Sequence, residues 1–228
     1  MKYYKVLKAD GSCANGGNGS WSLPTKKDGT WKPGKWMPKV RGELEPCMNG
    51  YHICRPQDLV HWLNEAIFEV EYNGKIIEDD NKCVVREARL LRKIETWDEK
   101  YARLYAADCA EKVLPIYEKD YPEDDTQRKA IQVARDFANG KTTRKELVAA
   151  RDAARDAARD AARDAARVAA WDAARDAARD AARDAASAAT RDAAWDADRV
   201  ATWGAAWDAA WGAAREWQTE RLFWYLGE

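Results

Sequence analysis

The sequence lacks three features that mark common classes of protein. It contains no apolar run of the roughly 18 residues that suggest a membrane-spanning helix. Its opening residues, MKYYKVLKAD, lack the apolar core of a secretory signal peptide. It also lacks an excess of charge, since 38 basic and 39 acidic side chains leave a formal net charge of −1, which argues against a nucleic-acid binder that depends on counterion release. We therefore expect a soluble cytoplasmic protein whose partners are neither membranes nor nucleic acids.

Motifs for cofactor binding and covalent catalysis are also missing. The run Asn15–Gly19 follows a predicted strand, but it lacks the spacing of a phosphate-binding loop and precedes no helix. No serine-nucleophile motif is present, and no two cysteines have the Cys-x-x-Cys spacing. The 5 cysteines are an odd number in a chain that can build its own core, so we expect reduced thiols and no bound cofactor.

One weak metal-binding alternative remains open. Cys47, His52 and Cys54 form a Cys-x4-His-x-Cys cluster, which together with a distant cysteine could supply the nitrogen and sulfur ligands that zinc prefers. The simpler interpretation is a pair of half-buried thiols beside a structural histidine. We expect no metal.

The N-terminal residues, 1–95, have the pattern of a small α+β domain. Alternating apolar and polar residues predict strands, and the dipeptide Asn73-Gly74 predicts a tight hairpin turn between two of them. A stretch rich in Gly, Pro, Lys and Trp, residues 11–43, predicts a long ordered loop. The expected strands are 3–7, 50–54, 66–72, 75–77 and 82–93, with a short helix at 59–64.

The remaining residues, 96–228, predict an all-α region. The segment Thr96–Glu99 has the form of a capping box, and it begins a helix that Pro115 must end or kink. A second helix is expected at 124–138, and Thr143–Glu146 is another capping box that begins a third. The predicted fold class is thus a small α+β domain followed by a helical, alanine-rich domain.

Residues 151–215 repeat the tetrapeptide Arg-Asp-Ala-Ala, with other residues in some units. Alanine is the best helix former, and neither Pro nor Gly occurs between Thr143 and Gly204. The sequence therefore predicts one helix of roughly sixty residues or more, about 90 Å long. Each unit advances about 40° beyond a full turn, so the paired alanines wind slowly around the helix. Such a segment offers shape and contact rather than reactive groups.

Tryptophan is abundant, and seven of the 12 residues lie at or after Trp171. On a straight helix these seven share an arc of about 160°, with alanines between them. The simplest interpretation is a face buried in the core, with Trp207 among its buried members. The alternative is a partner-binding ridge, because tryptophan is enriched at interaction hot spots. The candidate residues of this ridge are Trp195, Trp203 and Trp211.

The strands of the first domain resemble a small uncharacterised domain family common in phage genomes. The similarity rests on the first strand around Lys5-Val6, the Cys-x-x-Gly-Tyr-His-x-Cys motif that begins at Cys47, the strand Val70-Glu71 with its following Gly, and the final Val85–Glu87. Tyr51 stands where the family has Phe. The resemblance implies no known activity.

The order of these strands also weakly resembles ADP-ribosyltransferase-like folds. In those enzymes a helix and a later strand glutamate follow a Gly-Tyr-like strand. The resemblance implies an NAD-using enzyme with His52 and Glu87 as its candidate catalytic residues, although the first-strand His or Arg of those enzymes is not evident.

The second half resembles the alanine-rich helical family of immunity proteins of bacterial polymorphic toxin systems. This resemblance implies that the chain binds and neutralises a protein partner. The matching segments are Tyr105–Glu111, Val113–Pro115, Tyr121-Pro122, Arg128–Ile131, Ala134-Arg135, the tetrapeptide repeat and the ending Ala214–Leu222.

The function that these observations favour is a non-enzymatic binding protein of immunity or inhibitor type, which neutralises a toxin or a host factor. Two alternatives stay open. One is the NAD-using, ADP-ribosyltransferase-like enzyme. The other is a structural rod, in which the long helix serves oligomerisation.

Overall fold

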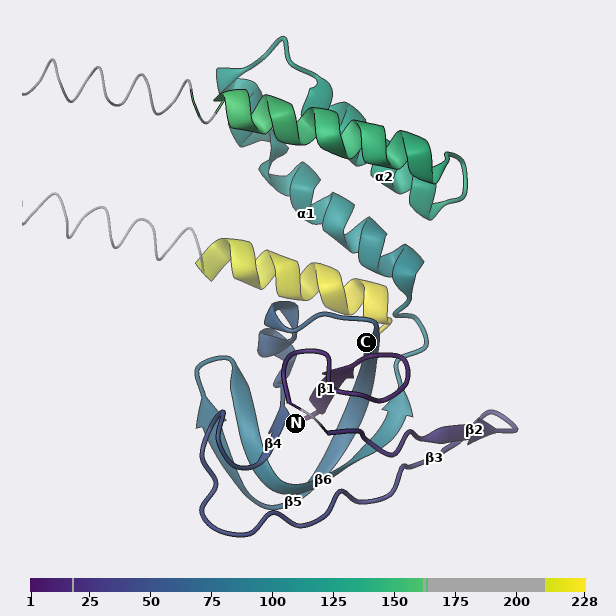
Figure 1. Cartoon of the computed structure of the whole chain (residues 1–228), viewed down its shortest axis with the longest axis vertical. Helices are drawn as coiled ribbons and strands as arrows, with labels where there is room; N and C mark the ends of the chain where they lie inside the picture. Colours follow the sequence, from purple (N-terminus) through teal and green to yellow (C-terminus); the bar gives the residue numbers. More distant parts are fainter. Residues whose placement is uncertain (18, 162, 164–211) are drawn as a thin grey trace, which may run out of the picture. The chain divides into compact units, whose positions relative to one another are not determined.

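A computed structural model describes residues 1–17, 19–161, 163 and 212–228 (Figure 1). The chain divides into two compact units. The first unit comprises Met1–Tyr105 together with Ala214–Glu228, and the second comprises Ala106–Ala213. The boundary that we expected at residue 95 falls inside the first unit, and the C-terminal segment belongs with the sheet rather than with the helices before it.

A four-stranded antiparallel sheet in the order β1-β5-β6-β4 forms the first unit. A bridge between Tyr4 and Cys54 joins β1 to the end of β4, and the long strands β5 and β6 curve, so the sheet forms a half-barrel (Figure 1). The expected mixed fold is confirmed, with a sheet first and helices after it. The strands are β1 (Tyr3–Leu7), β4 (Tyr51–Ile53), β5 (Ala66–Asp79) and β6 (Lys82–Lys93).

The hairpin turn predicted at Asn73-Gly74 is wrong. Strand β5 continues through both residues to Asp79, and the turn into β6 lies at residues 80–81. The pairing of β5 with β6 shifts in register between Asn73 and Ile76, and Gly74 has a φ of +85°. An Asn-Gly pair suits a glycine bulge as well as a tight turn. Pairing with the long strand β6 on both sides of the pair selects the bulge.

The expected long loop, residues 11–43, contains a short hairpin of β2 (Thr25–Lys27) and β3 (Thr30–Lys32). Its turn is Asp28-Gly29, where both residues have positive φ. After the hairpin, the loop follows the edge of β6 that β4 leaves unpaired. Backbone N–H groups of Gly34, Met37 and Val40 donate there to the carbonyl oxygens of Leu90, Ala88 and Arg86.

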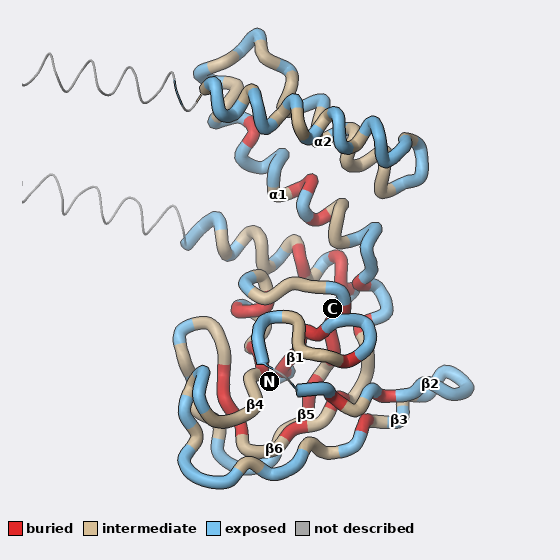
Figure 2. The backbone as a smooth tube through the Cα atoms, in the orientation of Figure 1, coloured by how far each residue is buried: buried red, intermediate tan, exposed pale blue. Residues whose placement is uncertain are grey.

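The short helix expected at 59–64 is a 3-10 helix, η1 (Pro56–His61). It begins earlier because Pro56 lies in its first turn, where a missing N–H costs nothing. The apolar core lies on the strands, where Figure 2 shows most of the buried segments of the first unit. The core cluster consists of Tyr3, Leu7, Trp21, Ile53, Ala66, Phe68, Val70, Cys83, Val85, Ala88 and Leu90.

Helix α1 (Glu99–Asp120) begins in the first unit and ends in the second. Its N-terminus is capped by Asp98, whose Oδ1 accepts a hydrogen bond from the Tyr101 N–H at 2.9 Å. Thr96 therefore does not have the capping role that the sequence predicted. Of the two outcomes expected at Pro115, an end of the helix is ruled out, because α1 continues through this residue to Asp120.

The second unit contains the rest of α1 and the helix α2 (Thr126–Ala138). Arg135 of α2 binds two carboxylates of α1, Asp108 at 2.7 Å and Glu111 at 2.6 Å. The capping box predicted at Thr143–Glu146 is confirmed, because each of these two residues accepts a hydrogen bond from the backbone N–H of the other. Residues 144–161 and 163 are helical, while residues 164–211, which hold most of the repeat, lie outside the described residues.

A helix at residues 212–226 completes the first unit. Leu222 and Leu226 on this helix are buried, and the Thr96 hydroxyl donates a hydrogen bond to the Leu226 carbonyl oxygen at 2.7 Å. The expected all-α second domain is thus described only in part, and its last helix packs with the sheet.

Candidate functional site

A cavity of about 470 Å³ lies in the first unit, in the range typical of small-molecule sites. Strand β1, the loop that follows it, β4, the end of η1 and the start of β6 all contribute to its wall. The sequence predicted a cluster of Cys47, His52 and Cys54, and all three line this cavity. Among the other lining residues are Lys5, Trp21, Trp62 and Lys82.

His52 has a structural partner in the cavity wall. Its Nε2 accepts a hydrogen bond from the backbone N–H of Cys47 at 3.0 Å, so the proton of the neutral ring lies on Nδ1. Burial lowers the pKa of His52, and Lys5 and Lys82 lower it further. Cys47 has a φ of +65°, an unfavourable backbone conformation for a side chain of this kind, and the bond to His52 holds it there.

The thiols of this cluster do not form a metal-binding arrangement with His52. The Nε2 lone pair already accepts the Cys47 N–H, and burial raises the pKa of the Cys54 thiol to about 12, so this thiol stays protonated. All 5 cysteines of the chain are free thiols. In the described part of the chain, no three His, Cys, Asp or Glu side chains are grouped as metal ligands.

Two lysines line the cavity, and each lies over a tryptophan ring. The Lys5 ammonium donates to the His52 carbonyl oxygen at 2.9 Å and lies 5.3 Å from the centre of the Trp21 ring. The Lys82 ammonium lies 5.5 Å from the centre of the Trp62 ring and 3.2 Å from an Asp79 oxygen. Cation–π contact with tryptophan is favourable at this distance. The cavity therefore combines positive charge with aromatic surface.

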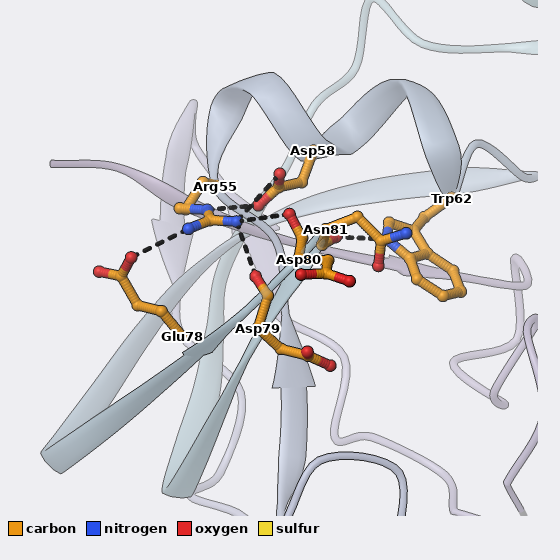
Figure 3. Close-up of polar contacts among 7 residues, drawn as sticks. All are labelled: Arg55, Asp58, Trp62, Glu78, Asp79, Asp80 and Asn81. Atoms are coloured by element: carbon orange, nitrogen blue, oxygen red, sulfur yellow. Dashed lines mark hydrogen bonds and ion pairs between the residues drawn. The ribbon is translucent and has the colours of Figure 1, made fainter. Parts of the chain in front are cut away.

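A polar network positions the part of the wall that carries Trp62 and Lys82 (Figure 3). Arg55 forms ion pairs with Asp58 at 2.5 Å and with Glu78 at 2.9 Å, and it donates to the carbonyl oxygens of residues 79 and 80. The indole N–H of Trp62 donates to the carbonyl oxygen of Asn81 at 2.7 Å. These bonds hold the turn between β5 and β6 against η1.

The two residues of the enzyme alternative do not lie together. His52 pairs with Val84 of β6, and Glu87 lies three residues further along that strand, where it accepts a hydrogen bond from Asn73. Successive side chains of a strand alternate between its faces, so Glu87 points to the face opposite that of Val84. Glu87 is not part of the cavity wall, whereas His52 is.

A second candidate site lies on the C-terminal helix. Trp224 is 65% exposed, and the Arg221 guanidinium lies 4.4 Å from the centre of its indole ring. The Tyr225 ring packs edge-on against Trp224 with ring centres 4.8 Å apart, and the Tyr101 ring lies 5.9 Å from that of Tyr225. We name Tyr101, Arg221, Trp224 and Tyr225 the Trp224 surface.

The helix that carries the Trp224 surface is held firmly. The Phe223 ring packs edge-on against Tyr4 of β1, with ring centres 5.7 Å apart. Glu228, just beyond the helix, forms ion pairs with Lys2 and Arg92. The exposed indole is therefore presented from a fixed element rather than from a free chain end.

The prediction that all seven C-terminal tryptophans share a buried face is wrong at Trp224. The helix buries Leu222, Tyr225 and Leu226 instead, with Tyr225 against Tyr101 and Tyr105 of α1, and it leaves Trp224 exposed. The predicted arc treated the segment as one straight helix and could not include the sheet as its packing partner. Trp171, Trp195, Trp203, Trp207 and Trp211 lie outside the described residues.

Sequence reasoning missed Lys5 and Arg221. Lys5 interrupts an apolar strand between Tyr3 and Leu7, which is a detectable signal because all three positions share one strand face. Arg221 lies three residues before Trp224, a spacing that places two side chains side by side on a helix.

Comparison with known proteins finds one family match in each half of the chain, as the resemblances to a small uncharacterised domain family and to an immunity family predicted. No curated protein and no solved structure gives a significant match. None of the helices that the structure describes is long and apolar enough to cross a membrane.

Residues 1–102 match a domain of unknown function, DUF7666. A second family profile covers residues 92–222, which is more than half of the chain. The chain therefore belongs to the family described as Imm-5 like putative immunity protein.

Proposed function

We propose that this chain neutralises a protein toxin by binding it, and that the Trp224 surface contacts the toxin. Membership of the immunity family supports the class of function. The observation that carries the assignment of the surface is Trp224, a large aromatic side chain that is 65% exposed next to the buried Tyr225 and Leu226.

The composition of the Trp224 surface fits a protein interface. Tryptophan, tyrosine and arginine are the residues most enriched among those that dominate binding energy. Arg221 lies over the indole of Trp224 and adds a planar cation to the aromatic contact area of this surface.

The rigidity of this surface also favours binding. Immobilising flexible side chains on association costs about 0.5–1.5 kcal/mol for each one. Trp224 packs against Tyr225, which is buried, and Arg221 stacks on both rings. These side chains are therefore already largely ordered in the folded chain, and they lose less conformational entropy when the toxin binds.

The first prediction concerns the variant Trp224→Ala in the full chain. Removing the exposed indole should weaken toxin binding by about 2 kcal/mol or more, roughly 30-fold. It should leave the free energy of unfolding within about 0.5 kcal/mol, because the side chain is mostly exposed. Tagged wild-type and variant chains would serve as baits, and captured proteins would be tested for toxicity and for rescue of growth by each chain.

Trp31→Ala is the matched control. Trp31 also lies beside a cation, since the Lys26 ammonium is 5.6 Å from the centre of its ring, but it belongs to the β2–β3 hairpin. This variant should capture the toxin and rescue growth as the wild type does. Equal capture by Trp224→Ala and wild type would refute the role of the surface, and captured proteins without toxicity would refute the immunity function.

A further inference from the structure

Lys5 lies at a position where the strand pattern calls for an apolar residue. Tyr3, Lys5 and Leu7 alternate along β1 and therefore share one face of the strand. Tyr3 and Leu7 both belong to the core cluster. The Lys5 side chain thus extends from the core-facing side of β1 and forms part of the cavity wall.

The positive charge of Lys5 has no negative partner among the described residues. Its ammonium makes one hydrogen bond, to the uncharged carbonyl oxygen of His52, and no carboxylate of the described chain acts on it. A lysine has three donors, and the structure gives Lys5 one hydrogen bond within the described residues. Burial lowers the pKa of Lys5, and the thiols of Cys13 and Cys54, which face the ammonium, act in the opposite direction and raise it. Burial raises the pKa of the Cys54 thiol itself to about 12, so this thiol is uncharged at neutral pH.

The cavity offers aromatic surface next to this charge. Trp21 and Trp62 are part of its wall, as are Met37 and Tyr51, and its volume is about 470 Å³. Lys82 adds a second ammonium, although Asp79 neutralises it in part. A buried charge without a partner is costly, and a bound anion would remove that cost.

We propose that this cavity binds a small organic carboxylate with a flat apolar body, whose carboxylate pairs with Lys5 and whose body lies against the tryptophan rings. This binding site is separate from the Trp224 surface and goes beyond the proposed toxin binding. An organic anion fits better than a free inorganic one for two reasons. The aromatic wall can make favourable contacts with an apolar group, and the volume of the cavity exceeds that of a single phosphate.

Calorimetric titration of the full chain with benzoate tests this proposal. Benzamide, which has nearly the same shape without the charge, and inorganic phosphate, which has charge without the apolar body, are the comparison ligands. Benzoate should bind, and each comparison ligand should bind at least tenfold more weakly. Equal binding of benzoate and benzamide, tighter binding of phosphate, or no benzoate binding at millimolar concentration would overturn the proposal.

Variants of Lys5 test whether its ammonium group is the positive charge that binds the carboxylate of benzoate. Lys5→Met should weaken benzoate binding at least tenfold, whereas Lys8→Met, at an exposed position just after β1, should leave it unchanged. Wild-type affinity should fall as the pH rises through the lowered pKa of Lys5, because the ammonium loses its proton. Lys5→Arg should bind benzoate without this loss, since arginine stays charged.

These measurements distinguish a loss of the Lys5 charge from a loss of the fold. If Lys5→Met does not fold, the pH dependence of benzoate binding and the Lys5→Arg variant still test whether Lys5 pairs with the carboxylate. A lysine with a purely structural role would not make the affinity for benzoate depend on its own protonation. Benzoate affinity that stays constant while Lys5 titrates would refute the assignment of the charge. Toxin binding by the Trp224→Ala series is measured independently, so failure of either proposal leaves the other intact.

Discussion

Two cations in the sheet unit have opposite surroundings. Arg55 has two carboxylate partners and two carbonyl acceptors, which satisfy most of its donors (Figure 3). Lys5, by contrast, has one carbonyl partner and faces the cavity. The first arrangement fixes a wall, and the second leaves a charge available to a ligand.

The second prediction follows from Arg55. Asp58, its partner, is only 4% exposed, so Arg55→Met would leave a buried carboxylate without its counter-charge. We expect a loss of about 3–5 kcal/mol in the free energy of unfolding, measured by chemical denaturation. Lys26→Met is the control, because the Lys26–Glu95 pair is largely exposed and should contribute about 0–1 kcal/mol. A loss below about 1 kcal/mol for Arg55→Met would contradict this account.

The candidate sites were predictable only in part. The short spacing of Cys47, His52 and Cys54 indicated that these residues lie together, and they share the cavity wall. The spacing could not show that the His52 ring accepts a backbone N–H, because that bond depends on the turn at Cys47. Nor could it bring Lys5 to the same cavity, since the Tyr4–Cys54 bridge and the Lys5–His52 hydrogen bond join segments about fifty residues apart in the sequence.

At the scale of elements, the C-terminal helix provides one layer of packing on the sheet unit. Its buried residues are Leu222, Tyr225 and Leu226, and Leu222 is fully buried. The remaining face carries Trp224. One helix therefore both stabilises the sheet and presents the proposed contact surface.

The third prediction tests the stabilising face of this helix. Leu222→Ala removes a fully buried side chain and should lower the free energy of unfolding by about 2–5 kcal/mol. Glu220→Ala, an exposed position on the same helix, should change it by about 0.5 kcal/mol or less. Equal effects of the two changes in thermal or chemical unfolding would mean that the helix does not pack as described.

Local patterns predicted the elements whose identity depends on their own residues. The bounds of β1 and β6 agree with the prediction, and so does the end of α2. The errors at Asn73-Gly74 and Trp224 arise where pairing or packing with a distant segment decides between two locally acceptable structures. The return of residues 212–226 to the sheet is the largest example, because no local signal specifies a partner more than a hundred residues away.

At the scale of the whole molecule, both histidines lie in the sheet unit and have lowered pKa values. Burial is the main cause for each, with Lys5 and Lys82 acting on His52 and with Arg215 acting on His61. In the unfolded chain both would titrate near the ordinary value of 6.5. The folded state therefore binds fewer protons than the unfolded state just below that pH.

The fourth prediction is a loss of stability in weak acid. The contribution of the two histidines to the free energy of unfolding should be fully present above pH 6.5. It should fall as the pH drops from there towards their lowered pKa values, because only the unfolded chain takes up protons in that range. The slope is at most about 1.4 kcal/mol per pH unit for each histidine. The double variant His52→Gln, His61→Gln should show little change between about pH 7 and pH 5, a window above the titration of ordinary carboxylates. An identical decline in the double variant would rule out the histidines as its source.

The split of the first unit between Met1–Tyr105 and Ala214–Glu228 has a consequence for biosynthesis. A ribosome makes the sheet strands first and the helix that covers them only after the whole of Ala106–Ala213. At about 5–20 residues per second, the sheet would wait on the order of ten seconds for its covering helix. During that interval Tyr4 lacks the ring of Phe223 against which it packs in the finished protein. Each tetrapeptide added to the repeat would lengthen this wait, so the number of repeats sets how long the nascent sheet lacks its covering helix.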